Sequence, residues 1–72
     1  MIAKNQLLHV RYDGRSIDVP LGDLDIGDLS SDRAVTSATA EYLDLPVQSL
    51  TGYVIDRHET GNLTIRPQAV FG

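Results

Sequence analysis

Apolar and polar residues alternate near the start of the chain in a pattern that predicts a β-hairpin. From Leu8 to Tyr12 every second residue is apolar or aromatic, and a similar alternation resumes after Asp13-Gly14. Asp-Gly between two such segments is typical of a two-residue hairpin loop. Pairing the strands outward from this loop puts the apolar residues on one face, whereas a one-residue slip would not. The predicted facing pairs are Tyr12 with Arg15, Val10 with Ile17 and Leu8 with Val19 on that face, and His9 with Asp18 and Arg11 with Ser16 on the other.

A different spacing predicts a helix in the middle of the chain. Ser30, Ser31 and Asp32 are three candidates for its N-cap. We expect about three turns of helix over residues 32–43, ending before Pro46, which disfavours helical geometry at the preceding residue. At spacings of three and four residues, the predicted apolar stripe consists of Val35, Ala38, Tyr42 and Leu43, while Thr36, Ser37, Thr39 and Glu41 are expected mostly off it.

The remaining segments predict extended structure and turns. Pro20 should end the second strand because it has no N–H to donate. Within residues 21–30, alternation of Leu24 and Ile26 with aspartates suits a short extended piece. Residues 50–57 predict a strand, residues 58–62 a turn and residues 63–66 a last strand, with Leu63 and Ile65 on one face and Pro67 ending its ladder. The predicted order is β-β-α-β-β.

Length and charge narrow the class of protein. The chain has 72 residues, which predicts one domain over residues 1–72, and it has no cysteine for disulfides or thiolate metal sites. Its net charge is −4, and its six basic residues are scattered. Nucleic-acid binding needs clustered basic residues, so it is not expected. No apolar run approaches the ~20 residues of a membrane span, and the start does not resemble a signal peptide, so we expect a cytoplasmic protein that does not bind membranes.

The groups that could carry chemistry do not form a recognisable catalytic or metal-binding motif. His9 should face Asp18 in a solvated cross-strand pair, and His58 falls in a predicted turn. Asp23, Asp25 and Asp28 do not fit a calcium loop, because the twelfth position from Asp23 is an alanine rather than a glutamate. We therefore assign no catalytic residue, metal site or cofactor, and we expect a protein that is not an enzyme.

Three stretches taken in order resemble the ubiquitin family. They are HVRYDGRSIDV in the hairpin, SSDRAV at the start of the helix and YLDLPVQSLTGYVI at its end. The last strand and a C-terminal glycine also resemble that family. The resemblance covers most of the chain and implies an α+β, β-grasp fold: a mixed sheet with one helix on one face and the first and last strands central and parallel.

The sequence departs from this family mainly at its end. Family members that modify proteins or carry sulfur usually end in Gly-Gly, whereas this chain ends in Phe71-Gly72. The resemblance implies a protein modifier or sulfur carrier in which Gly72, preceded by Phe71, is adenylated by an activating enzyme and passed on. A glycine suits a narrow activating cleft because it has no Cβ, and Phe71 would require a wider one.

A second function is open on the same residues. The chain could be a binding module that is not conjugated and that docks a partner protein, through an uncovered sheet face containing Val54 or through the apolar tail formed by Val70 and Phe71. A third interpretation is that Val70 and Phe71 simply pack back on the domain. In each case the expected partners are other proteins, and we expect a monomer.

Overall fold

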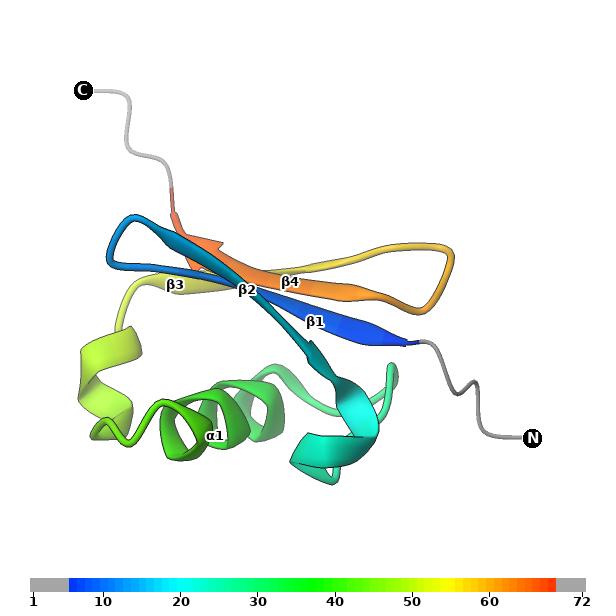
Figure 1. Cartoon of the computed structure of the whole chain (residues 1–72), viewed down its shortest axis with the longest axis horizontal. Helices are drawn as coiled ribbons and strands as arrows, with labels where there is room; N and C mark the ends of the chain where they lie inside the picture. The colour runs from blue at the N-terminus through cyan, green and yellow to red at the C-terminus, as the bar shows by residue number, and fades with distance from the viewer. Residues whose placement is uncertain (1–5, 69–72) are drawn as a thin grey trace.

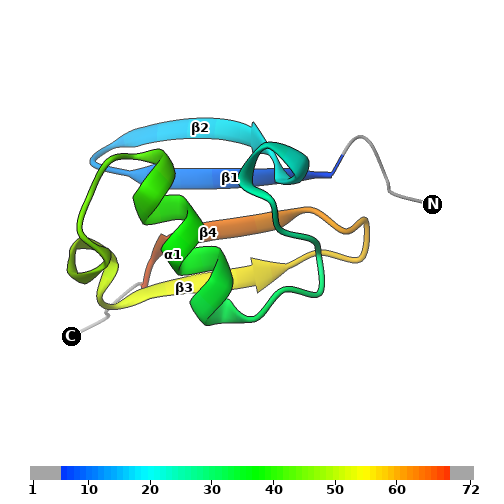
Figure 2. The same cartoon turned by 90° about the horizontal axis from the view of Figure 1, so that it is seen from below.

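The computed structural model describes residues 6–68, which form a four-stranded sheet with one helix on one side. The elements in chain order are β1 (Leu7–Tyr12), β2 (Arg15–Pro20), η1 (Leu21–Leu24), α1 (Asp32–Tyr42), η2 (Val47–Leu50), β3 (Tyr53–Arg57) and β4 (Leu63–Pro67), where η1 and η2 are short 3-10 helices. Figure 1 shows α1 and both 3-10 helices on the same side of the sheet, and Figure 2 shows α1 crossing that face.

The sheet has the order β2-β1-β4-β3 and confirms the expected α+β, β-grasp fold. β1 and β4 are the central strands and run parallel, with Leu8 beside Leu63 and Val10 beside Ile65. Each central strand also pairs antiparallel with an edge strand, β1 with β2 and β4 with β3. The first and last strands of the chain therefore form the middle of the sheet, as expected.

The hairpin of β1 and β2 has the register that the sequence predicts. Leu8 faces Val19, Val10 faces Ile17 and Tyr12 faces Arg15. Asp13 and Gly14 form the two-residue loop with φ values of 54° and 74°. Positive φ at both loop positions matches the right-handed twist of the strands, which explains why Asp-Gly fixes this register.

The core lies between the sheet and α1. Nine apolar side chains are buried there: Leu8, Val10, Val19, Leu21, Val35, Ala40, Leu50, Leu63 and Ile65. Strand residues of this core alternate with exposed or half-buried polar residues, as expected for a sheet with one covered face. The other face of the sheet therefore carries the remaining side chains of the four strands.

The helix begins where expected, but its buried face is rotated from the predicted stripe. Ser31 is the N-cap, and its Oγ accepts a hydrogen bond from the Ala34 N–H at 3.1 Å. Val35, Thr39 and Ala40 are buried, whereas Tyr42 is 51% exposed. Thr39 can be buried because its hydroxyl donates to the Val35 carbonyl at 2.7 Å. This hydrogen bond satisfies the polar group that burial removes from water. The prediction that Thr39 lies off the stripe and Tyr42 on it is therefore wrong.

Residues 21–24 form η1 and not the predicted extended piece. Leu21 is buried directly after β2, and its N–H donates to the Gln6 carbonyl at 3.0 Å. A tight turn brings Leu24 back against the same core, and Asp25, with φ of 58°, ends it. Burial of two leucines three residues apart outweighs the alternating pattern, because an extended segment would separate them.

The strand predicted over residues 50–57 is shorter at its start. Leu50 ends η2 and is buried in the core, and β3 begins only at Tyr53. Gly52 lies between them with φ of 84°, which lets the chain turn from η2 into the sheet. The predicted turn over residues 58–62 and the last strand are confirmed, with Leu63 and Ile65 both buried.

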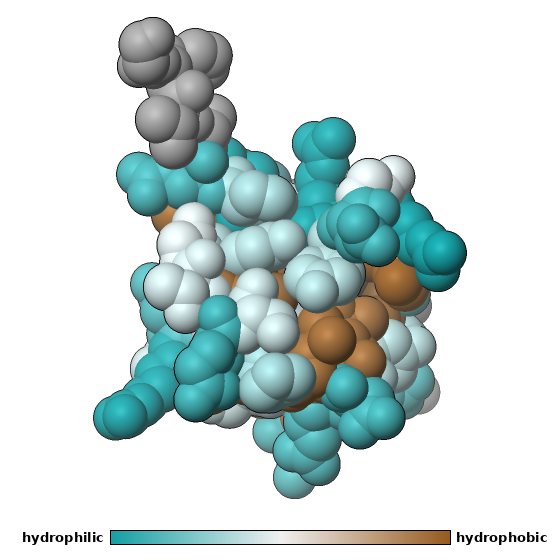
Figure 3. Space-filling model, turned by 90° about the vertical axis from the view of Figure 1, so that its left-hand side faces the viewer, coloured by the Kyte–Doolittle hydropathy of each residue, from teal (hydrophilic) through white to brown (hydrophobic). Residues whose placement is uncertain are grey.

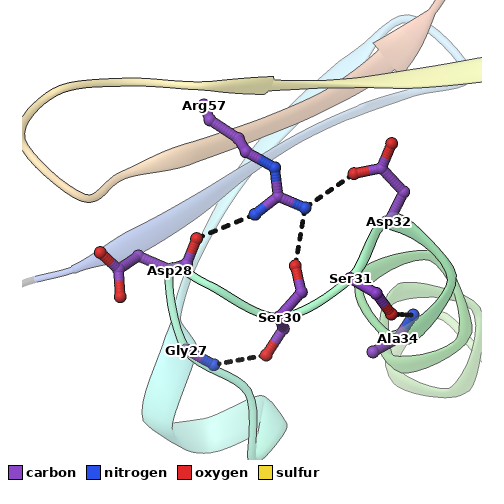
Figure 4. A network of polar contacts seen from close by, with 7 residues as sticks. All are labelled: Gly27, Asp28, Ser30, Ser31, Asp32, Ala34 and Arg57. Carbon is purple, nitrogen blue, oxygen red and sulfur yellow. Dashed lines mark hydrogen bonds and ion pairs between the residues drawn. The ribbon is translucent and has the colours of Figure 1, made fainter.

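Arg57, at the end of β3, holds the loop between η1 and α1 (residues 25–31) against the sheet (Figure 4). We call this segment the crossover loop. Its guanidinium donates to the Asp28 carbonyl at 2.8 Å and to the Ser30 carbonyl at 2.6 Å. It also pairs with the Asp32 carboxylate at 2.7 Å, in the first turn of α1. One side chain thus connects the edge strand, the crossover loop and the start of the helix.

Candidate functional site

The face of the sheet opposite α1 is covered by none of the described helical elements, and we call it the open face (Figure 1). Alternation along each strand assigns side chains to it, because residues on either side of a buried position point the other way. The residues of the open face are Leu7, His9 and Arg11 from β1, Ser16, Asp18 and Pro20 from β2, Val54 and Asp56 from β3, and Thr64 and Arg66 from β4.

Polar contacts link neighbouring strands across this face. His9 Nδ1 lies 2.5 Å from Asp18 Oδ1, so the pair predicted from the hairpin register is present. On the other half of the sheet, Arg66 Nε donates to Asp56 Oδ2 at 2.7 Å. The hydrogen bond from Arg66 holds the pKa of the Asp56 carboxyl below its usual range. Asp56 and Arg66 are therefore a charged pair at neutral pH.

His58 is exposed in the turn after β3, as the sequence predicts, and it also contacts the adjacent strand. Its Nε2 lies 2.9 Å from the Thr64 hydroxyl on the adjacent strand. A His beside a hydroxyl is one part of a nucleophilic pair, but a third group that orients the imidazole is also needed. Within residues 6–68 no hydrogen bond to His58 Nδ1 is present.

Val54 is an apolar residue of the open face in the described chain, as is half-buried Leu7 of β1. Val54 is half-buried, pairs with Arg66 across the strands, and is not among the apolar residues packed on the core. This position agrees with the outward orientation that the docking hypothesis requires. The other predicted partner-binding or carrier residues, Val70, Phe71 and Gly72, lie outside the described residues.

A pocket of about 400 Å³ lies where the β1–β2 hairpin meets the C-terminal end of β4, and we call it the arginine pocket. It is lined by Arg11, Tyr12, Asp13, Gly14, Arg15, Ser16, Arg66 and Pro67. The Tyr12 ring lies 6.0 Å from the Tyr53 ring between centroids, in a tilted arrangement that supports this end of the sheet. Burial raises the pKa of the Tyr53 hydroxyl, together with the nearby Tyr12 and Asp13.

The sequence interpretation missed the arginine pocket because it treated the basic residues as scattered. The hairpin register already places Arg11 and Arg15 on either side of the loop. Arg66 joins them only through the parallel pairing of β1 with β4, which connects residues more than fifty positions apart. Combining the predicted hairpin with the predicted central position of the last strand would have brought the three together.

A second pocket, of about 580 Å³, lies between η1 and α1 and is acidic. Its lining consists of Asp23, Leu24, Asp25, Ala38, Glu41 and Tyr42. Asp28, the third aspartate of the tested calcium motif, is not part of this lining, and its carbonyl accepts from Arg57 instead. Within residues 6–68 no group of three or more His, Asp or Glu side chains is arranged to hold a metal ion.

Large exposed apolar side chains in the described chain lie outside the sheet. They are Leu29 at 91% exposure in the crossover loop, Tyr42 at 51% at the end of α1 and Val47 at 47% in η2. Figure 3 views the end of the molecule with the hairpin tip and η2, where a brown apolar area is bordered by polar side chains. Single exposed apolar residues are common on protein surfaces and do not by themselves mark a site.

Comparisons of this chain with protein-family models, with curated proteins and with solved structures find no match. Among the helices of residues 6–68, none combines the length and the apolar character that crossing a membrane would require. The features of the described chain that bear on its function are the fold, the open face and the arginine pocket.

Proposed function

We propose that this chain is a small ubiquitin-like protein that acts by binding other proteins through the open face of its sheet. The observation that supports this proposal most directly is the one-sided architecture. All described helical elements lie on one side of the sheet, and the other side is left uncovered (Figure 1). Such a face is held by four paired strands and changes little when a partner docks on it.

The chemistry of the open face suits a polar protein surface. Half-buried Val54 is flanked by the Asp56–Arg66 ion pair, and the His9–Asp18 pair lies on the same face, across β1 and β2. A small apolar contact surrounded by charged groups is typical of interfaces between proteins that also exist separately. Charged groups at the rim select the partner and its orientation more than they add affinity. This proposal assigns the chain no catalytic residue.

The test uses two matched valine substitutions in affinity capture from cells that make the protein. Val54→Gln changes the open face, and Val47→Gln makes the same change on η2, on the helix side of the sheet. We expect proteins captured by the wild type to be captured by Val47→Gln and reduced roughly tenfold with Val54→Gln, because a buried apolar contact is replaced by an amide. Quantitative mass spectrometry of the three samples measures this.

Capture of the same proteins by Val54→Gln and by the wild type, in equal amounts, would contradict the proposal. Loss with Val47→Gln alone would place the binding surface on the helix side. Circular dichroism and thermal melting of both variants verify that each is folded. Both positions are outside the apolar core, so neither substitution creates a core cavity.

A second candidate function is the protein modifier or sulfur carrier that the resemblance implies. The observation that favours it is the end of β4. The central strand reaches Pro67, and the Gln68 N–H still donates to the Gly52 carbonyl at 3.1 Å. Three residues, Ala69, Val70 and Phe71, then lie between the described fold and Gly72, and this segment is what an activating enzyme would have to admit. This function requires Gly72 to be the last residue of the mature protein.

Mass spectrometry of the protein from its native source tests the carrier function. We expect Gly72 linked to lysines of other proteins if the chain is a modifier, or present as a thiocarboxylate if it is a sulfur carrier. A free carboxylate in every molecule, in cells that contain an activating enzyme for it, would exclude both and leave the binding function.

A further inference from the structure

We propose that the arginine pocket binds an acidic peptide segment of a partner protein, whose carboxylates pair with Arg11 and Arg15. This inference rests on the proposed binding function and specifies the chemistry of the partner. The pocket lies beside the open face and shares two arginines with it, Arg11 and Arg66. A partner docked on the open face can therefore extend a segment into the pocket.

The pocket concentrates positive charge in a chain that is acidic overall. The chain has six basic residues and a net charge of −4, yet three of the six line this one pocket. Asp13 is the carboxylate in the lining, and Asp56 pairs with Arg66 from outside it. After these two carboxylates are counted against the three arginines, one positive charge remains without compensation.

Arg11 and Arg15 are not committed to other contacts within the described chain. Both side chains are exposed, and neither forms a hydrogen bond or ion pair with any of residues 6–68. Arg57, in contrast, bonds two carbonyls and a carboxylate. A guanidinium presents a planar fork of donors that matches a carboxylate, so two uncommitted guanidinium groups are well suited to binding acidic side chains.

The parallel register places like charges next to each other at this pocket. Val10 pairs with Ile65, and the residues that follow them on the two central strands are Arg11 and Arg66. Like charges on adjacent strands destabilise a sheet. Asp56 neutralises Arg66 only from the β3 side. An incoming carboxylate would relieve the remaining repulsion, and this charge complementarity indicates an anionic ligand.

The surroundings of the pocket favour a peptide over other anions. Tyr12 and Pro67 contribute apolar surface to its walls, which can contact the aliphatic part of a glutamate or a neighbouring apolar residue. The lining belongs to three strands and a hairpin loop, without the helix N-terminus that commonly binds free phosphate.

The test measures binding of a fluorescein-labelled hexaglutamate peptide to the full chain by fluorescence anisotropy at low salt. We expect saturable binding to the wild type and roughly tenfold weaker binding to the double variant Arg11→Gln/Arg15→Gln. Arg33→Gln is the matched control, because Arg33 is an exposed arginine on α1 outside the pocket. It should bind within about twofold of the wild type, and added salt should weaken binding to both.

Equal binding by the wild type and the double variant would overturn the proposal, as would equal binding of a hexaglutamine peptide. A single-stranded oligonucleotide that competes better than hexaglutamate would assign the pocket to nucleic acid instead. Circular dichroism verifies that the variants are folded. Failure of the peptide to bind, while Val54→Gln still reduces partner capture, would reject the pocket assignment and leave the proposed function standing.

Discussion

Replacing Ile65 by alanine is expected to unfold a large fraction of the protein. Ile65 is completely buried in the central strand β4, between Val10 on β1 and Ile55 on β3. Removing three of its side-chain carbons from a packed core costs about 2–5 kcal/mol. A domain of this size without disulfides has a free energy of unfolding of only about 3–5 kcal/mol. The substitution therefore consumes most of the stability.

Urea denaturation followed by circular dichroism measures this effect. Ile65→Val is the graded control and should cost about 0.5–1.5 kcal/mol, because one methyl group is lost. Val54→Ala is the matched control on the open face and should cost less than Ile65→Ala, because Val54 is not packed on the core. A melting temperature of Ile65→Ala within a few degrees of the wild type would mean that β4 does not occupy the centre of the core.

Replacing Arg57 by alanine is expected to cost roughly 1–2 kcal/mol, a large effect for a surface residue. The substitution removes hydrogen bonds to the carbonyls of Asp28 and Ser30 and the ion pair with Asp32. This loss of unfolding free energy is smaller than the sum expected for three charged hydrogen bonds. The Arg57 side chain is 37% exposed, so water competes for the same acceptors. Thermal or urea unfolding measures the global cost.

Hydrogen exchange separates this role from a general loss of stability. In Arg57→Ala we expect faster exchange at the Gly27 amide, which donates to Ser30 Oγ, and at the Ala34 amide, which donates to Ser31 Oγ (Figure 4). The amides between β1 and β2 should change less. Arg33→Ala is the control, an arginine one position after Asp32 on α1 that leaves the network intact. Equal exchange at Gly27 in the wild type and Arg57→Ala would contradict the fastening role.

Local chemistry accounts for the elements that the sequence predicts well. Asp13-Gly14 fixes the hairpin loop and its register, and Ser31 fixes the start of α1, because each acts within a few residues of the chain. The position of β4 between β1 and β3 has no local signal. Only the resemblance of ordered motifs to a known family predicts it, and the strand order β2-β1-β4-β3 confirms this arrangement.

Tertiary packing determines the features that the sequence pattern does not predict: η1, the buried face of α1 and the arginine pocket. Leu21 turns into the core immediately after β2, so burial determines η1 rather than the alternation that follows it. Thr39 is hidden under α1 because its hydroxyl bonds within the helix, and a scan for apolar residues overlooks it. The arginine pocket combines residues from both ends of the described chain, so its charge becomes visible only once the strands are paired.

The late position of β4 in the chain has a consequence for synthesis on the ribosome. β4 is the last element of the described chain, and it is the strand that joins the β1–β2 hairpin to β3. Until residue 67 has left the ribosome, the hairpin and β3 have no strand between them to complete the sheet, and the edges of β1 and β3 that pair with β4 stay open. Pairing across so long a stretch of sequence also slows folding. A chain interrupted before Leu63 would therefore be removed rather than accumulate as a partly folded domain.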